Sequence, residues 1–227
     1  TYKNESFSYD KLMGCTTRKE FMLKVMVVSK IIKKETKGKY IGIMLPALQS
    51  TNLLVMATYM AGKIPVMLNW TVGKNVLEHC VNTAKLEHVL TASSFFDRVR
   101  DQLPDSMKPK CIMFDHKVAE MSLFTKLSGL ISSIFPKAPA TKPSDVAVIL
   151  FTSGSESLPK AVPLTHKNVL SDIRGCLTNI NIQSDEILFG FLPPFHSFGF
   201  TLLSVLPLVS GLKVAYSPDP SANNELV

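Results

Sequence analysis

The 227-residue sequence lacks the features of a disulfide-stabilised secreted domain or of a metal centre. Its four cysteines (Cys15, Cys80, Cys111 and Cys176) are far apart, and they form no C-x-x-C pair or other metal-ligand spacing. A disulfide framework in a chain of this size is usually denser, and no N-terminal signal peptide is visible. We therefore expect reduced, mostly buried thiols in a cytoplasmic setting, and no metal ligand in this chain.

A membrane-spanning run is also missing. The longest charge-free stretch, Ile187 to Leu212, is interrupted by Pro193, Pro194, His196 and Pro207. Because proline breaks helices, this stretch is better explained by buried strand, loop and helix than by a helix that crosses a bilayer.

Acidic residues are in the minority. Eighteen Asp and Glu stand against twenty-five Lys and Arg, so the formal net charge is +7. A positive surface suits nucleic acid, anionic lipid or an anionic cofactor and does not choose among them. No basic cluster with interleaved aromatic residues stands out, so we expect no nucleic-acid partner and interpret most of this charge as a solvated face.

Apolar segments of strand length alternate with segments of helix length. The first helix is expected to begin with Ser8 as its N-cap and Asp10 in its first turn. Four apolar side chains then share one face at helical spacing: Phe21, Val25, Val28 and Ile32. Strands are expected at 40–45, 64–68, 146–151, 187–191 and 213–216 and near Val89 and Ile112, and helices at 51–61, 74–84, 121–134 and from His166 onward. This β-α-β order predicts an α/β fold with mainly parallel sheets flanked by helices.

The segment 136–145 contains several prolines and is expected to be a linker. It would separate a first α/β subdomain, residues 1–135, from a second and incomplete α/β subdomain, residues 146–227. The second subdomain would carry the loop described next.

The apolar segment 146–151 is followed by T-S-G-S-E-S-L-P-K-A-V, residues 152–162. A loop at the carboxyl end of a parallel strand lies where α/β sheets hold their ligands. Its backbone N–H groups, hydroxyls and lysine can surround phosphate oxygens. The P-loop pattern G-x-x-x-x-G-K-[ST] is absent, which disfavours a standard P-loop NTPase, and an ordinary Ser-rich turn remains open.

The loop resembles the phosphate-binding loop of the adenylate-forming superfamily (acyl-CoA synthetases, luciferases and peptide-synthetase adenylation domains), which reads roughly T-S-G-S-T-G-x-P-K-G-V. The matching positions are Thr152, Ser153, Gly154, Ser155, Pro159, Lys160 and Val162. Glu156 replaces a Thr, and an acid beside a triphosphate is an electrostatic cost unless it faces a cation or solvent. Ser157 and Ala161 replace glycines, which adds strain wherever a positive φ is required. The Ser-Gly-Ser-Glu form is similar to the acyl-[acyl-carrier-protein] synthetase branch.

Two further segments resemble the superfamily. Residues 192–199, L-P-P-F-H-S-F-G, match the aromatic-His segment that lies beside the acyl substrate, although a lone His in an apolar stretch is more often a hydrogen-bonded core residue. Residues 61–69 match A-G-x-x-P-x-x-L-N. The Asn69-Trp70-Thr71 part is most similar to the bifunctional acyl-[acyl-carrier-protein] synthetase/2-acylglycerophosphoethanolamine acyltransferase, and these residues are scaffold by default.

The resemblance implies ATP-dependent conversion of a fatty acid to acyl-AMP, followed by transfer to a thiol acceptor, with acyl carrier protein favoured over coenzyme A. The implied ATP-binding residues are Thr152, Ser153, Gly154, Ser155, Glu156 and Lys160, and the implied acid-facing residues are Phe195, His196 and Gly199, with His196 as the catalytic candidate. Mg²⁺ would accompany ATP, with its protein ligand outside this chain.

The superfamily's adenine-side aromatic-Gly-x-Thr-Glu segment, its ribose-binding Thr-Gly-Asp segment and its small lysine-bearing C-terminal domain have no counterpart here. We therefore expect an N-terminal fragment with little or no adenylation activity of its own. Two other classes of protein stay open. The first is a catalytically degenerate nucleotide- or lipid-binding scaffold, which the departures at Glu156, Ser157 and Ala161 favour. The second is a membrane-surface acyltransferase or lipid-binding domain, which the net charge of +7 and the apolar stretch 187–212 favour. The expected location is cytoplasmic, with any contact to the inner face of a membrane made through the parent protein.

Overall fold

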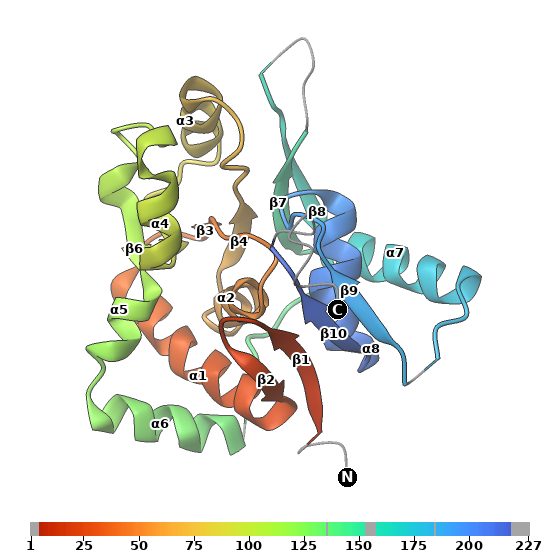
Figure 1. The fold of residues 1–227 in the computed structure, drawn as a ribbon. Helices are drawn as coiled ribbons and strands as arrows, with labels where there is room; N and C mark the ends of the chain where they lie inside the picture. The colour runs from red at the N-terminus through yellow and green to blue at the C-terminus, as the bar shows by residue number, and fades with distance from the viewer. Residues whose placement is uncertain (1–4, 135, 153–157, 184, 219–227) are drawn as a thin grey trace.

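The computed structural model describes residues 5–134, 136–152, 158–183 and 185–218. Two sheets form its centre, and helices pack around them (Figure 1). The strands are β1 (Ser6–Asp10), β2 (Gly14–Thr17), β3 (Tyr40–Ile43), β4 (Ile64–Met67), β5 (Val89–Thr91), β6 (Cys111–Met113), β7 (Val146–Phe151), β8 (Ala161–Thr165), β9 (Ile187–Gly190) and β10 (Lys213–Tyr216). The helices are α1 (Arg18–Glu35), α2 (Gln49–Met60), α3 (Lys74–Thr83), α4 (Ser93–Val99), α5 (Phe114–Ala119), α6 (Leu123–Ile134), α7 (His166–Asn179) and α8 (Leu206–Ser210), with short 3₁₀ turns at Arg100–Gln102 and Lys108–Lys110 and a π-helical segment η4 (Gly199–Val205).

Both sheets are mainly parallel. The larger has the strand order β6-β5-β3-β4-β7-β8 and the smaller has the order β2-β1-β10-β9. Within the described part of the chain, only the β7–β8 and β1–β2 pairs are antiparallel, and the other neighbouring strands run parallel. The predicted α/β class with mainly parallel sheets and flanking helices is confirmed.

The predicted start of the first helix is wrong. Ser8 and Asp10 lie on strand β1, and α1 begins only after Thr17. Thr17 and Glu20 form a capping box there, in which each side chain accepts a hydrogen bond from the other's backbone N–H. The polar residues of β1 serve another helix: the Asp10 carboxylate accepts a hydrogen bond of 2.9 Å from the backbone N–H of Gln49, at the start of α2. A contact between residues so far apart in sequence leaves no local pattern.

The apolar face of α1 was predicted correctly. Phe21, Val25, Val28 and Ile32 are all buried in the main hydrophobic core, together with residues of the larger sheet and of α2. Their spacing of three and four residues keeps them on one side of the helix, so burial of that side holds α1 against the sheet.

Strand β8 was not expected. It pairs antiparallel with β7, with Phe151 opposite Ala161, and occupies the edge of the larger sheet. An edge strand accommodates Pro163, because one side of the strand needs no ladder hydrogen bond. The segment that follows β7 therefore connects a β-hairpin.

The apolar stretch Ile187 to Leu212 forms β9, a loop, η4 and α8. Phe200, Leu203 and Leu206 are buried within it. Among the described residues, no helix is long and apolar enough to cross a bilayer.

Each sheet takes strands from both sides of segment 136–145. Strands β7 and β8 follow this segment and join β3–β6, whereas β1 and β2 precede it and join β9 and β10. The division of the chain into two subdomains at this segment stays a prediction.

Candidate functional site

The carboxyl ends of β4 and β7 lie side by side. The two strands are parallel neighbours with Val66 opposite Ile149, and Asn69 and Thr152 each lie three positions beyond that pair. Parallel strands present their carboxyl ends, where α/β proteins hold ligands, at the same edge of a sheet. The Asn69 side chain is engaged locally, because its Oδ1 accepts hydrogen bonds from the Thr71 backbone N–H (2.9 Å) and hydroxyl (2.7 Å).

The two ends of the predicted phosphate loop are joined by a pair of hydrogen bonds. The Thr152 N–H donates to the Lys160 carbonyl at 3.1 Å, and the Lys160 N–H donates to Thr152 Oγ1 at 3.0 Å. Both side chains are exposed. The predicted loop residues Ser153, Gly154, Ser155 and Glu156 lie outside the described residues.

A neighbouring helix holds the Lys160 end of the loop. Nε2 of His79, on α3, lies 3.0 Å from the Pro159 carbonyl oxygen. A carbonyl oxygen only accepts, so this hydrogen bond requires the proton on Nε2. Pro159 itself is buried. The backbone just before Lys160 is therefore anchored, while the lysine side chain extends into solvent.

An aromatic cluster connects this edge with the segment that carries His196. The Trp70 ring contacts Phe95 of α4 and Phe195 edge-to-face, each with ring centroids 4.9 Å apart. Such pairs contribute about 0.5–1.5 kcal/mol beyond the area they bury. Phe195 is only 6% exposed, and its ring lies 4.9 Å from the imidazole of His196, which is exposed. Trp70 thus joins the end of β4 to the segment after β9.

The segment around His196 is tightly folded. The His196 N–H donates to the Pro193 carbonyl at 3.1 Å, and the Phe200 N–H donates to the His196 carbonyl at 2.8 Å. A Cβ on Gly199 would lie 2.2 Å from the Pro193 carbonyl oxygen, far inside van der Waals contact. Only glycine fits this position without a backbone shift.

The structure brings some of the predicted residues together and leaves others apart. Thr152 and Lys160 pair at the sheet edge, and Phe195 and His196 reach the same region through Trp70. Within the described part of the chain, no hydrogen bond or ion pair joins His196 to Thr152 or Lys160. The substrate-facing roles of Phe195, His196 and Gly199 stay predictions.

Sequence reasoning missed the contribution of His79. This residue has no sequence signal, because its contact with Pro159 spans 80 positions.

All four cysteines are free thiols in the structure. The expectation that most of them are buried is wrong, because only Cys80 is buried, Cys111 and Cys176 are half-buried, and Cys15 is exposed. Burial raises the pKa of Cys80 to about 11 and that of Cys111 to about 12. Both thiols are therefore neutral at physiological pH and act as packing groups. The described residues contain no cluster of three or more His, Cys, Asp or Glu suited to a metal ion.

The fold and the candidate site describe an α/β protein with a hairpin loop at the carboxyl edge of a parallel sheet. The profile of the AMP-binding enzyme family matches residues 16–227, and the chain belongs to this family.

Curated relatives are similar over most of this chain. Fatty acyl-CoA synthetase A of Dictyostelium discoideum is 26% identical over 189 residues, which cover 77% of this chain and 28% of the relative. Long-chain-fatty-acid–CoA ligase 1 of Homo sapiens is 26% identical over 205 residues, which cover 81% of this chain and 29% of the relative. The chain therefore spans less than a third of the length of these relatives.

Solved structures share the fold. The structure of O-succinylbenzoate coenzyme A synthetase from Bacillus subtilis in complex with AMP superposes with a TM-score of 0.76 at 19% identity, covering 97% of this chain and 54% of that one. At this identity the likeness shows the fold alone, and it matches the N-terminal part of the adenylate-forming architecture.

Proposed function

We propose that this chain supplies the phosphate-binding loop and part of the acid-binding site of an acid–thiol ligase. The ligase would activate a fatty acid with ATP to acyl-AMP and pass the acyl group to a thiol. Family membership and the names of the two fatty acyl-CoA ligase relatives support this proposal. The observation that carries it is the closed pair of Thr152 and Lys160 at the carboxyl edge of β7.

The described residues suit a polyphosphate. Thr152 Oγ1 accepts a hydrogen bond from the Lys160 backbone, so its own O–H remains available to donate to a phosphate oxygen. The Lys160 ammonium is exposed and makes no ion pair among the residues that the structure describes. The Thr152 hydroxyl and the Lys160 ammonium are thus both available to phosphate oxygens where the two ends of the loop meet.

In the proposed reaction, the fatty-acid carboxylate attacks the α-phosphorus of ATP and pyrophosphate leaves. Thr152 would lie near the α-phosphate, and Lys160 would neutralise the β- and γ-phosphates together with Ser153 and Ser155, which are assigned here from the sequence alone. His196 would face the acid. These groups act by positioning and charge neutralisation. When bound, Mg²⁺ would neutralise negative charge on the triphosphate, and its protein ligand is expected outside this chain.

The acceptor is the finer part of the proposal. The Ser-Gly-Ser-Glu form of the loop favours acyl carrier protein, whereas the relatives named above are coenzyme A ligases. Supplying each thiol in turn to the enzyme with a radiolabelled fatty acid distinguishes the two. Labelled acyl carrier protein would support the carrier-protein assignment, and labelled coenzyme A alone would replace it.

Fatty-acid-dependent exchange of pyrophosphate into ATP tests the adenylation step directly. The assay uses the longest natural chain that contains these residues, because residues 1–227 alone are expected to show little exchange. Lys160→Ala should lower the exchange rate by about 10²–10³-fold, the usual effect of removing one group that stabilises transition-state charge. Lys167→Ala, which removes an exposed lysine at the start of α7, is the matched control and should exchange like the wild type.

Absence of exchange with short, medium and long acids from a folded protein would refute the ligase proposal and support a degenerate loop on a binding scaffold. Part of the apolar stretch Ile187 to Leu212 is folded into β9, η4 and α8, where Phe200, Leu203 and Leu206 are buried. Ile187, Phe198 and Val209 are more than half exposed, so the membrane-surface alternative keeps part of the support that it drew from this stretch.

A further inference from the structure

Helix α6 presents an aliphatic face to solvent. Four side chains at helical spacing are 42–62% exposed: Leu127, Leu130, Ile131 and Ile134. The opposite side is held firmly against α1, because a Cβ on Gly129 would lie 2.4 Å from Cγ2 of Val27. Glycine thus lets the two helices approach closely, and the aliphatic face of α6 points away from the core.

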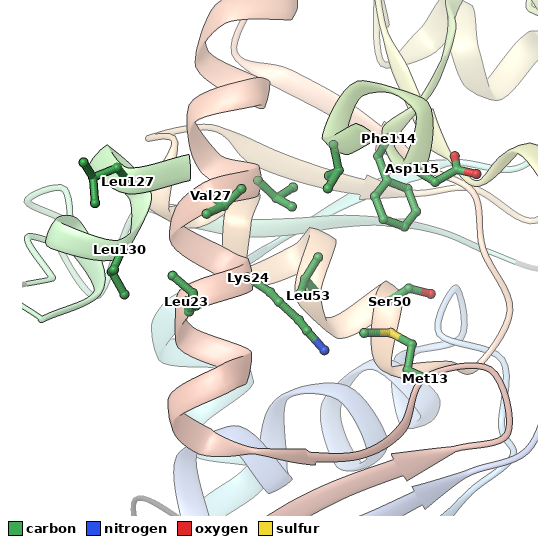
Figure 2. Close-up of a pocket in the computed structure, with 12 residues that line it drawn as sticks. Met13, Leu23, Lys24, Val27, Ser50, Leu53, Phe114, Asp115, Leu127 and Leu130 are labelled. Carbon is green, nitrogen blue, oxygen red and sulfur yellow. The ribbon is translucent and has the colours of Figure 1, made fainter. Parts of the chain in front are cut away.

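The exposed face continues into an apolar trough across α1. This trough has a volume of about 850 Å³ and is lined almost entirely by aliphatic and aromatic side chains, with Lys24, Ser50 and Asp115 as its polar members. Figure 2 shows Leu127 and Leu130 of α6 on one side of α1 and Met13 on the other. Connected apolar surface of this kind marks an interaction site.

A cationic pocket lies beside the same helix. Lys30, Lys33 and Lys34 of α1 and Lys137 after α6 line a cavity of about 600 Å³. Of these four lysines, only Lys34 makes an ion pair with another described residue, Glu35, at 3.7 Å. The Lys30 ammonium donates a hydrogen bond to the Ser128 hydroxyl of α6. Three of the four charges therefore lack an anionic partner within the described chain.

We propose that α6, with its aliphatic face and the adjoining lysine pocket, is a docking surface for an anionic lipid bilayer. The aliphatic side chains would enter the boundary between headgroups and acyl chains, and the lysine pocket would receive anionic headgroups. This pairing of an apolar helix face with flanking lysines is the composition of an interfacial helix. Lysine is depleted in protein–protein interfaces, so the same composition disfavours a protein partner.

The dimensions fit a surface contact. Helix α6 has 12 residues and is about 18 Å long, whereas the hydrocarbon core of a bilayer is about 30 Å thick. The helix can lie in the interface and cannot cross it. In Figure 1, α6 and the β7–β8 hairpin lie at opposite ends of the molecule, so docking leaves the candidate site free. The proposal does not depend on the ligase activity.

Co-sedimentation with lipid vesicles tests this surface. The protein is the longest natural chain that contains residues 1–227, and the vesicles are phosphatidylcholine alone or phosphatidylcholine with phosphatidylglycerol. Binding is expected only to the anionic vesicles and should weaken as salt rises. The triple change Lys30→Gln, Lys33→Gln and Lys34→Gln should weaken binding about 100-fold, from about 1 kcal/mol per lysine. The pair Ile131→Gln and Ile134→Gln should weaken it about tenfold or more, because two partly exposed aliphatic side chains no longer enter the bilayer.

Matched controls separate this surface from net charge and general hydrophobicity. Lys19→Gln, Lys74→Gln and Lys167→Gln remove the same charge from exposed positions elsewhere, and Leu170→Gln with Ile180→Gln removes exposed aliphatic side chains on and just after α7. Both control sets should bind like the wild type, with unchanged circular dichroism in every variant. Lack of binding to anionic vesicles, or equal loss in test and control sets, would overturn the proposal. So would a dimer in solution that the α6 changes dissociate, because the face would then bind a second copy of the chain.

Discussion

Replacement of Gly199 by alanine tests whether the segment around His196 is as tightly packed as the structure indicates. The added Cβ would lie 2.2 Å from the carbonyl oxygen and 2.9 Å from the carbonyl carbon of Pro193, and 3.1 Å from the carbonyl oxygen of Leu192. These are backbone atoms, so no change of rotamer relieves the overlap. The backbone of 192–199 must move, which costs about 1–3 kcal/mol, as for other overpacked sites.

For a domain of this size, each kcal/mol lowers the melting temperature by about 2–4 °C, so Gly199→Ala should melt about 2–12 °C below the wild type. The control is Gly175→Ala, inside α7, where a Cβ meets nothing within 4 Å. Alanine is the better helix former, so the control should gain about 0.5–1 kcal/mol. Thermal unfolding followed by circular dichroism measures both. A Gly199→Ala protein as stable as the wild type would falsify the packing argument, and so would a control that loses as much.

Three further predictions concern the aromatic cluster and the cysteines. Trp70→Ala should lower the free energy of unfolding, measured in urea, by about 3–5 kcal/mol, because it leaves a cavity between Phe95 and Phe195. Trp70→Phe keeps an aromatic ring at this position and should lose clearly less. Equal losses in the two variants would contradict a packing role for Trp70. Burial raises the pKa of Cys80 to about 11 from 9.0, so its neutral thiol stabilises the fold below pH 9 and that contribution is lost as the pH rises from 9 toward 11. Between pH 9 and pH 11, the urea midpoint should therefore fall less in Cys80→Ala than in the wild type. An identical fall in both proteins would refute the raised pKa of Cys80. At pH 8 a thiol reagent should label the exposed Cys15 far faster than Cys80.

Local sequence patterns predicted the elements that are stabilised by local periodicity. The spacing of Phe21, Val25, Val28 and Ile32 identified the buried face of α1, since a helix returns to the same side every three to four residues. The continuous apolar run 146–151 identified β7, which is buried along most of its length. Ser8 and Asp10 misled the prediction because short polar residues suit both a helix N-cap and a strand end, and only the contact of Asp10 with Gln49 distinguishes the two.

By itself, the sequence determined the alternation of strands and helices, the hydroxyl-rich loop that ends at Lys160, and the likeness to adenylate-forming enzymes. These features depend on composition and spacing within a short window, which chain neighbours supply. Only the tertiary structure decided the strand order, the hairpin partner β8, the contact of Trp70 with Phe195, and the joining of α6 to α1 at Gly129. Each of these depends on side chains or strands that meet after the chain has folded back on itself, and pairing over such separations is selected by packing of the whole core.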